Sequence, residues 1–276
     1  RQGGFTGGGI NAVTRSGTND WHGSIFGSQR AENFVGKGPF IDENVGSPTF
    51  GEQNRPVTTF DQDQYGGRIG GPIMRDRLFF FLSGERNERS EPTGTSAAGD
   101  APEQVSASLR TALERVSEIL NDTYNFDPGP LTEIQRQTGN DSYFGRLDWN
   151  INDDHRAALR YSKLEQVVPK LPGIGNSSIA LSSYWYDQNK TFESLVGEVF
   201  SNWTDNFTTE FKVSRRDYAS EAATNGSLPS ISFDVGEQSI NLGTERNRHA
   251  NLIETEQLSL FDTLDAAPAR AAGLRA

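Results

Sequence analysis

Few side chains in this sequence are spaced for catalysis or metal binding. The histidines His22, His155 and His249 lie far apart in a chain without cysteine, and no His-Glu-x-x-His pattern is present. Neither a zinc site nor a Ser-His-Asp arrangement is therefore predicted. Residues 61–66 (DQDQYG) place acids and a glycine in the order of a calcium loop, but Pro72 stands where that loop requires a bidentate glutamate. We predict no catalytic, cofactor-binding or metal-binding residue, and we expect that the protein is not an enzyme.

The overall composition excludes several further classes of protein. The 276 residues carry 37 acidic and 26 basic side chains, a net charge of −11, which argues against nucleic acid as a partner. The longest apolar run, Leu78 to Leu82, is far shorter than the roughly 18 residues that a transmembrane helix needs. A helical membrane protein is therefore excluded.

The elements that would position any functional side chain are predicted to be strands. In residues 142–151, for example, Leu147 and Trp149 would share one side of a strand, and Arg146 and Asp148 would share the other. Such alternation with a period of two is typical of a strand whose two sides meet different surroundings. The same pattern, strong or weak, predicts eight strands: 21–27, 65–73, 78–87, 142–151, 155–164, 195–199, 207–216 and 251–261.

The connections between these strands alternate between short and long. Short turns are expected at 74–77, 152–154 and 204–206, whereas 31–60, 88–141, 166–187 and 219–249 are long and polar. Short turns at one end of the strands and long loops at the other end are typical of an outer-membrane barrel. We therefore predict an all-β fold, an antiparallel up-and-down meander that forms a partial transmembrane β-barrel with long extracellular loops.

Strand length and aromatic positions favour the same fold. A membrane-crossing strand needs about 9–11 residues, and segments 77–88, 142–151, 155–165 and 206–218 are long enough. Aromatic residues near the strand ends suit the girdles found at membrane interfaces. These residues are Trp21, Trp149, Tyr161, Trp203 and Tyr218.

One amphipathic helix is expected inside the longest loop, over residues 101–121. Val105, Leu109, Leu113 and Val116 recur there at three- and four-residue spacing. Such a helix could hold a ligand, or it could pack its apolar stripe on neighbouring loops; we favour packing.

Three stretches of sequence resemble a known family. Residues 8–19 (GGINAVTRSGTN), followed by 21–26 (WHGSIF), resemble the junction between the plug and the first barrel strand of TonB-dependent outer-membrane receptors. Residues 64–73 (QYGGRIGGPI) and 77–81 (RLFFF) resemble a hairpin of the Oar-like subgroup, whose members usually carry a carboxypeptidase-regulatory-like domain. The resemblance implies a barrel of about 22 strands closed by a plug.

The resemblance also implies a domain organisation. Residues 1–18 would be the C-terminal end of the plug domain, and residues 19–262 would form the N-terminal portion of the barrel, with about eight strands. Residues 263–276, rich in Ala, Arg and Pro, are expected to be an aberrant or disordered tail, and we hypothesise a truncated or frameshifted gene end.

The activity that the resemblance implies is energised uptake of a scarce solute, a siderophore, glycan or peptide, across the outer membrane of a Gram-negative bacterium. Expected partners are outer-membrane lipid, the solute, and a TonB-type energy-coupling protein that acts through plug regions outside this chain. Loop aromatics are candidate ligand contacts, although such residues are also common as interfacial anchors. These candidates are Phe34, Phe40, Phe50, Tyr184, Trp185 and Tyr186.

Two alternatives from other classes stay open at this point. A secreted all-β adhesion or carbohydrate-binding module would also suit the polar composition and the aromatic loops. A β-rich glycoside hydrolase stays open only because acidic residues are plentiful.

Overall fold

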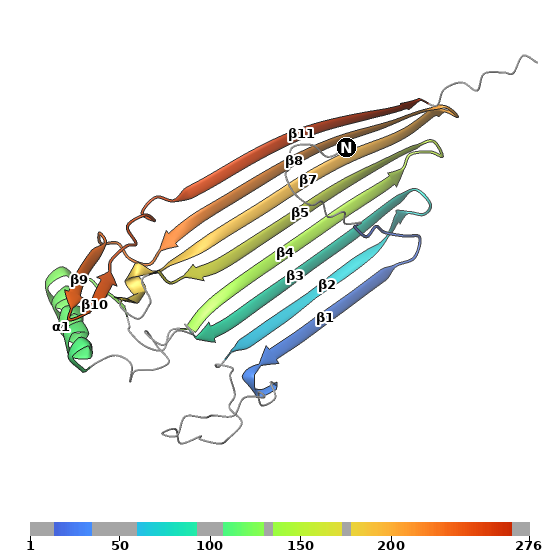
Figure 1. Cartoon of the computed structure of the whole chain (residues 1–276). Helices are drawn as coiled ribbons and strands as arrows, with labels where there is room; N and C mark the ends of the chain where they lie inside the picture. Colours follow the sequence, from blue (N-terminus) through green and yellow to red (C-terminus); the bar gives the residue numbers. More distant parts are fainter. Residues whose placement is uncertain (1–13, 35–59, 93–106, 130–134, 173–177, 267–276) are drawn as a thin grey trace, which may run out of the picture.

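The computed structural model describes residues 14–34, 60–92, 107–129, 135–172 and 178–266. Eight long strands form one open antiparallel sheet in which each strand pairs with the next long strand along the chain (Figure 1). They are β1 (His22–Ala31), β2 (Asp61–Met74), β3 (Leu78–Pro92), β4 (Gln135–Asn150), β5 (His155–Lys170), β7 (Tyr186–Thr204), β8 (Phe207–Thr224) and β11 (Leu252–Ala266). The predicted all-β, up-and-down meander is confirmed. No helix among these residues is long and apolar enough to cross a bilayer.

Tight turns join the strands at one end of the sheet, as predicted. The β2–β3 turn closes with a hydrogen bond from the Arg77 amide to the Met74 carbonyl (3.1 Å), and Asp76 adopts a left-handed conformation with φ of 63°. The β4–β5 and β7–β8 connections are also short, at residues 151–154 and 205–206. β1, β3, β5 and β8 end, and β2, β4, β7 and β11 begin, at the opposite end of the sheet (Figure 1).

The strands are longer than the sequence pattern indicates. β5 continues to Lys170 and β8 to Thr224, so both run into segments that were predicted as loops. β11 continues to Ala266, past the expected tail boundary at residue 262; residues 267–276 lie outside the described residues. The β5 extension 166–170 (QVVPK) and the β8 extension 219–224 (ASEAAT) lack the regular apolar alternation that marks a strand.

The two faces of the sheet differ in chemistry. Directly paired residues of an antiparallel sheet point to the same side. One row therefore carries Phe81, Arg146 and Arg160, and the adjacent row on the opposite side carries Leu82, Gly145 and Tyr161. We call the side of Arg146 the inner face and the side of Leu82 the outer face.

Large apolar side chains are exposed along the outer face. Their exposed fractions include 92% for Ile25, 51% for Leu82, 45% for Leu159 and 66% for Leu258. A water-soluble sheet would cover such a surface, since contiguous exposed apolar patches mark contact with a partner or a membrane. The predicted assignment of apolar and polar sides is confirmed.

Aromatic residues border this apolar band and follow the strand tilt. Tyr65, Tyr143 and Tyr161 mark the edge of the band that is nearer the long connections. Trp149 and Trp203 mark the edge that is nearer the tight turns. On β4, Tyr143 lies two residues away from the position that is in the same row as Tyr65 of β2. This shift across two strands corresponds to a strand tilt of about 35°, typical of membrane barrels. Tyr218, predicted as a girdle residue, instead pairs with Phe192 on the inner face, because its position has the opposite parity along β8.

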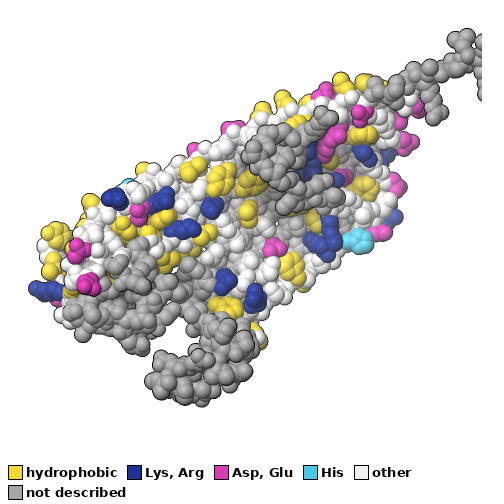
Figure 2. Space-filling view, viewed as in Figure 1, with side chains coloured by type: hydrophobic (Ala, Val, Ile, Leu, Met, Phe, Trp, Pro, Cys, Tyr) yellow, Lys and Arg dark blue, Asp and Glu magenta, His cyan; other side chains and the backbone are white. Residues whose placement is uncertain are grey.

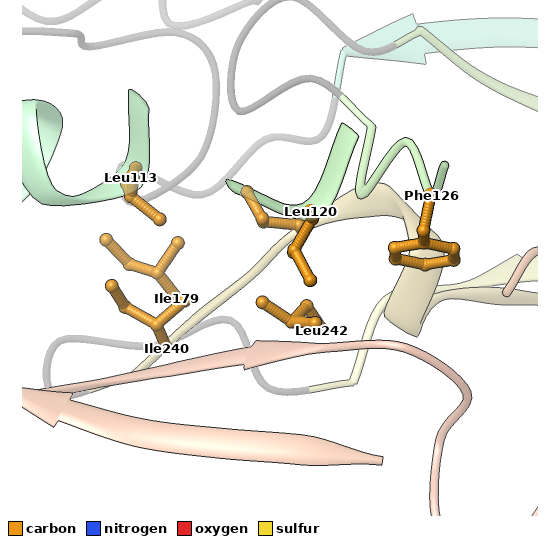
Figure 3. Packing of buried hydrophobic residues seen from close by; sticks show 7 residues of the cluster. Leu113, Leu120, Phe126, Ile179, Ile240 and Leu242 are labelled. Atoms are coloured by element: carbon orange, nitrogen blue, oxygen red, sulfur yellow. The ribbon is translucent and has the colours of Figure 1, made fainter. Parts of the chain in front are cut away.

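The best-packed hydrophobic core lies outside the long sheet, in a cap built from the long connections. The cap contains α1 (Ala107–Tyr124), β6 (Ser178–Ala180), the 3-10 turn η3 (Ser182–Tyr184), β9 (Ile231–Val235) and β10 (Gln238–Leu242). Strands β6, β10 and β9 form a second sheet. Figure 3 shows Leu113 and Leu120 of the helix facing Ile179, Ile240 and Leu242 of that sheet. The favoured interpretation of the helix, packing on neighbouring loops, is confirmed, whereas the second sheet was not predicted.

A charge placed on the outer face should be far more costly than one on the inner face. Leu159→Arg is expected to lower the free energy of unfolding by about 2–4 kcal/mol, the cost of a basic side chain near the bilayer midplane. Ala158→Arg, on the inner face between Asp148 and Glu198, should change it by less than about 1 kcal/mol. Urea unfolding in lipid vesicles measures both; equal costs would contradict the assignment of faces.

The hydrophobic core of the cap should stabilise the cap but not the barrel. Ile240 is fully buried, so Ile240→Ala is expected to destabilise the cap by about 2–5 kcal/mol. Protease cleavage of the cap in intact cells should accelerate, while the heat-modifiable gel mobility of the barrel is retained. Ile231→Ala, at a 36% exposed position of the same sheet, should leave cleavage almost unchanged; the reverse order would contradict the core assignment.

Candidate functional site

The inner face is lined by polar side chains that bond to one another across neighbouring strands. Gln64 Nε2 donates to Glu85 Oε1 (2.8 Å), and Gln166 Nε2 donates to Asn140 Oδ1 (2.8 Å). Further along, Gln188 Nε2 donates to Ser220 Oγ (2.8 Å). Such a hydrogen-bonded polar wall suits the water-filled or plugged lumen of a barrel.

The segment that precedes β1 lies over this face (Figure 1). Arg146 holds it there, because Nη1 of the guanidinium donates to both the carbonyl oxygen (2.9 Å) and the hydroxyl oxygen (2.8 Å) of Thr14. Asp148, two residues along β4, accepts hydrogen bonds from Nε and Nη2 of the same guanidinium at 2.7–3.0 Å. The carboxylate thus orients the guanidinium toward the segment, and both side chains are about four-fifths buried.

Two further contacts fix the same segment. Gly17 lies so close to the sheet that a Cβ there would overlap the carbonyl oxygen of Phe80 and come within 2.9 Å of that of Gly71. Asn19 bonds twice to the β2–β3 turn, donating to Asp76 Oδ1 (2.6 Å) and accepting from the Asp76 amide (2.8 Å). We call residues 14–21 with these contacts the junction anchor.

A hollow of about 560 Å³ opens beside the junction anchor, partly bounded by Thr14. Four phenylalanines contribute to its wall, alongside serines, Arg68 and Glu85. The phenylalanines are Phe26, Phe81, Phe144 and Phe192. Figure 2 shows this side of the molecule, where charged side chains are scattered among hydrophobic ones. Aromatic walls with a few polar groups are typical of sites that bind small ligands.

The structure separates the predicted ligand contacts. Phe34 ends the 3-10 turn η1 (Glu32–Phe34) and is 74% exposed, whereas Phe40 and Phe50 lie outside the described residues. Tyr184 is half-buried. The four described candidates lie in two separate parts of the chain, at η1 and in residues 184–186, and the role of all six stays a prediction.

Trp185 and Tyr186 are structural parts of the neck between the cap and β7. They are only 5% and 8% exposed, and the guanidinium of Arg248 lies over the Tyr186 ring at 5.3 Å. The indole Nε1 of Trp185 is buried without a hydrogen-bond partner among the described residues. Both rings are therefore largely buried at this neck, and their role as ligand contacts stays a prediction.

The junction anchor was the feature that sequence reasoning missed. Period-two alternation placed Arg146 and Asp148 correctly on the wet side of β4, but their partner Thr14 lies 132 residues away from Arg146. Within the described part of the chain, no group of three His, Asp or Glu residues could hold a metal ion.

Long antiparallel strands, an apolar outer face, a polar inner face and tight turns at one end define the wall of an outer-membrane barrel. Residues 13–257 match the family model described as an outer membrane beta barrel domain. The chain belongs to this family, and its location is the outer membrane of a Gram-negative bacterium.

Within that class the chain is TonB-dependent receptor-like. It is 32% identical over 175 residues to the TonB-dependent transporter Oar of Myxococcus xanthus, a match that covers 63% of this chain and 15% of that relative. The resemblance inferred from the sequence is thereby confirmed, and the family is one of transporters. No solved structure matches the chain.

The close contact between Gly17 and the sheet gives a direct test of the junction anchor. Gly17→Ala should push the segment off the sheet and lower stability by about 1–3 kcal/mol, the usual cost of overpacking. Limited proteolysis within residues 14–21 should become faster. Gly139→Ala, on β4 where a Cβ would meet nothing within 4 Å, is the matched control and should leave cleavage unchanged. Equal protection in both variants would contradict the close approach.

Proposed function

We propose that this chain is the wall and plug junction of an energised outer-membrane transporter that takes up a scarce solute. In this proposal, residues up to 18 end the plug, the eight long strands form part of the barrel, and a TonB-type coupling protein acts on the plug through regions outside this chain. The solute is captured by the extracellular connections and passes along the inner face.

The observation that carries the proposal is the junction anchor. The segment lies over the inner face and is held by an oriented arginine, a close glycine contact and a turn. A chain that blocks a lumen and can be pulled needs a fixed end on the wall, since force applied elsewhere would otherwise move the whole segment. The junction anchor supplies that fixed end, and the hollow beside it would be uncovered or closed as the upstream chain moves.

The chemistry of the inner face supports a solute rich in hydrogen-bonding groups. Amide side chains such as Gln64, Asn140 and Gln166 can both donate and accept, and the phenylalanine wall of the hollow adds apolar contact. Siderophores, glycans and peptides all combine such polar groups with apolar surface. A secreted adhesion module does not explain the exposed apolar band on the outer face.

Energised uptake is tested with cells that carry the complete receptor. Uptake of a labelled ferric siderophore, an oligosaccharide and a peptide is measured with and without a protonophore. For the true solute class, we expect the protonophore to lower uptake at least tenfold. Uptake that persists after the proton gradient collapses would contradict energy coupling, and no uptake of any of the three would contradict the solute classes.

Arg146→Ala should weaken energised uptake, because the junction anchor loses its hydrogen bonds to Thr14 while the inner face stays wet. We expect a several-fold lower uptake rate with unchanged amounts of folded receptor in the membrane. Arg160→Ala, which breaks a 2.9 Å ion pair with Glu198 on the same face without touching the junction anchor, is the matched control. Equal effects of the two variants would contradict a specific role for the junction anchor.

A further inference from the structure

Unpaired basic side chains gather on the inner face, although the chain as a whole carries a net charge of −11. On the outer face of the described long strands, every lysine and arginine is ion-paired with carboxylates. On the inner face, Arg146 and Arg160 are ion-paired, but other cations have no carboxylate partner in the described part of the chain. These cations include Arg68, Arg156, Lys190, Lys212 and Arg216. The inner face therefore presents positive charge to the lumen.

Arg68 and Arg15 bring this charge to the hollow beside the junction anchor, since both border it. The Nε group of Arg68 donates to Ser24 Oγ (2.8 Å), which orients the guanidinium and leaves its terminal nitrogens free to donate to a ligand. Arg15 likewise has no ion pair among the described residues, and both arginines are exposed. The nearby Arg146 differs, because its donors are already used within the junction anchor.

Acidic residues cancel only part of the positive charge around the hollow. Glu85 borders the hollow, but it already accepts a hydrogen bond from Gln64 Nε2 (2.8 Å). Lys163 also borders it, with an ammonium group that is paired with Glu165 and Glu193. The two arginines and Glu85 together leave an excess of one positive charge, which suits a ligand with a single negative charge.

Apolar side chains form much of the remaining wall. The ring of Phe26 lies over β2, where a Cβ on Gly66 would come within 2.8 Å of it. The rings of Phe81 and Phe144 lie close together, with centroids 6.1 Å apart. Phe144 lies in the same row as Arg68, two strands or about 10 Å away. A ligand that contacts both needs an apolar body joined to its charged group by a short spacer.

We propose that the hollow binds the carboxylate end of a solute that has an apolar body. Arg68 and Arg15 bind the carboxylate through charge-assisted hydrogen bonds, for which the guanidinium offers paired donors. The phenylalanine rings contact the apolar body, and the hydroxyls of Ser83 and Ser162 donate to further oxygen atoms of the solute. That this acid is the transported solute rests on the proposed function, whereas binding in the hollow does not require energised uptake.

The test measures binding to the complete receptor in detergent by saturation-transfer NMR, with small probes of matched shape. The probe 3-phenylpropionate carries a carboxylate and a ring, and 3-phenylpropionamide is its neutral counterpart. The wild type should bind the acid about fivefold more tightly than the amide, a preference that added salt weakens. Acetate, which lacks the ring, should bind about fivefold more weakly than 3-phenylpropionate.

Variants of the wall separate the charged contacts from the apolar ones. R15Q/R68Q should abolish the preference for the acid and leave binding of the amide unchanged. Phe144→Ala should weaken binding of acid and amide by equal factors, because only apolar contact is lost. The matched control R156Q/K190Q removes two inner-face cations that do not border the hollow, and it should bind all probes like the wild type. Heat-modifiable gel mobility checks folding; if R15Q/R68Q does not fold, R68Q alone should lower the preference about twofold.

Several results would overturn the proposal: equal binding of acid and amide in the wild type, an unchanged preference in R15Q/R68Q, or an equal loss in the control. Acetate binding as tight as that of 3-phenylpropionate would contradict the apolar contact. Tighter binding of 2-phenylethylphosphonate would assign the hollow to phosphate-type ligands instead of carboxylates. Failure of the transporter proposal is distinguishable, because the protonophore would then leave solute uptake unchanged while the acid still binds.

Discussion

The rest of this structure depends on one constraint: every long strand must meet hydrocarbon on one side and water on the other while leaving none of its backbone unpaired in lipid. Antiparallel pairing satisfies the backbone of the six strands between the edge strands β1 and β11, since lipid cannot hydrogen-bond it. Period-two geometry then sends Leu82, Leu147 and Leu159 outward and Arg146, Arg160 and Gln166 inward from the same strands. The exposed apolar surface, which would be a liability in water, is here the stabilising contact.

Because the wall meets lipid and water rather than a second layer, the buried core lies elsewhere. The long connections build it themselves by packing α1 on the small sheet of β6, β10 and β9. The molecule therefore combines a wall whose faces are set by the membrane with a cap that is packed as an ordinary globular unit. Trp185 and Tyr186 lie where the two meet, and both rings are buried there.

The sequence was sufficient to predict the long strands, their faces, the tight turns and the helix, because each depends on residues close together in the chain. It was not sufficient for the ends of β5 and β8, where the apolar alternation disappears, or for the end of β11. It also missed β6, β9 and β10, which are short; β9 and β10 form a hairpin, and β10 pairs with β6 from a different connection. The junction anchor could not be predicted for a related reason. The sequence pattern places Arg146 on a face of its strand, but only the folded structure shows that Thr14 lies next to it.

The central claim, that one side of each strand meets lipid and the other meets water, is tested most directly by spin labels. The chain has no cysteine, so single cysteines can be introduced at each position from 157 to 162 on β5 and labelled in the membrane-inserted receptor. The account predicts that collisions with oxygen are frequent at 157, 159 and 161, and that collisions with a water-soluble nickel chelate are frequent at 158, 160 and 162 wherever the plug leaves the label accessible. Accessibility to the nickel chelate on both sets, or no alternation at all, would contradict it.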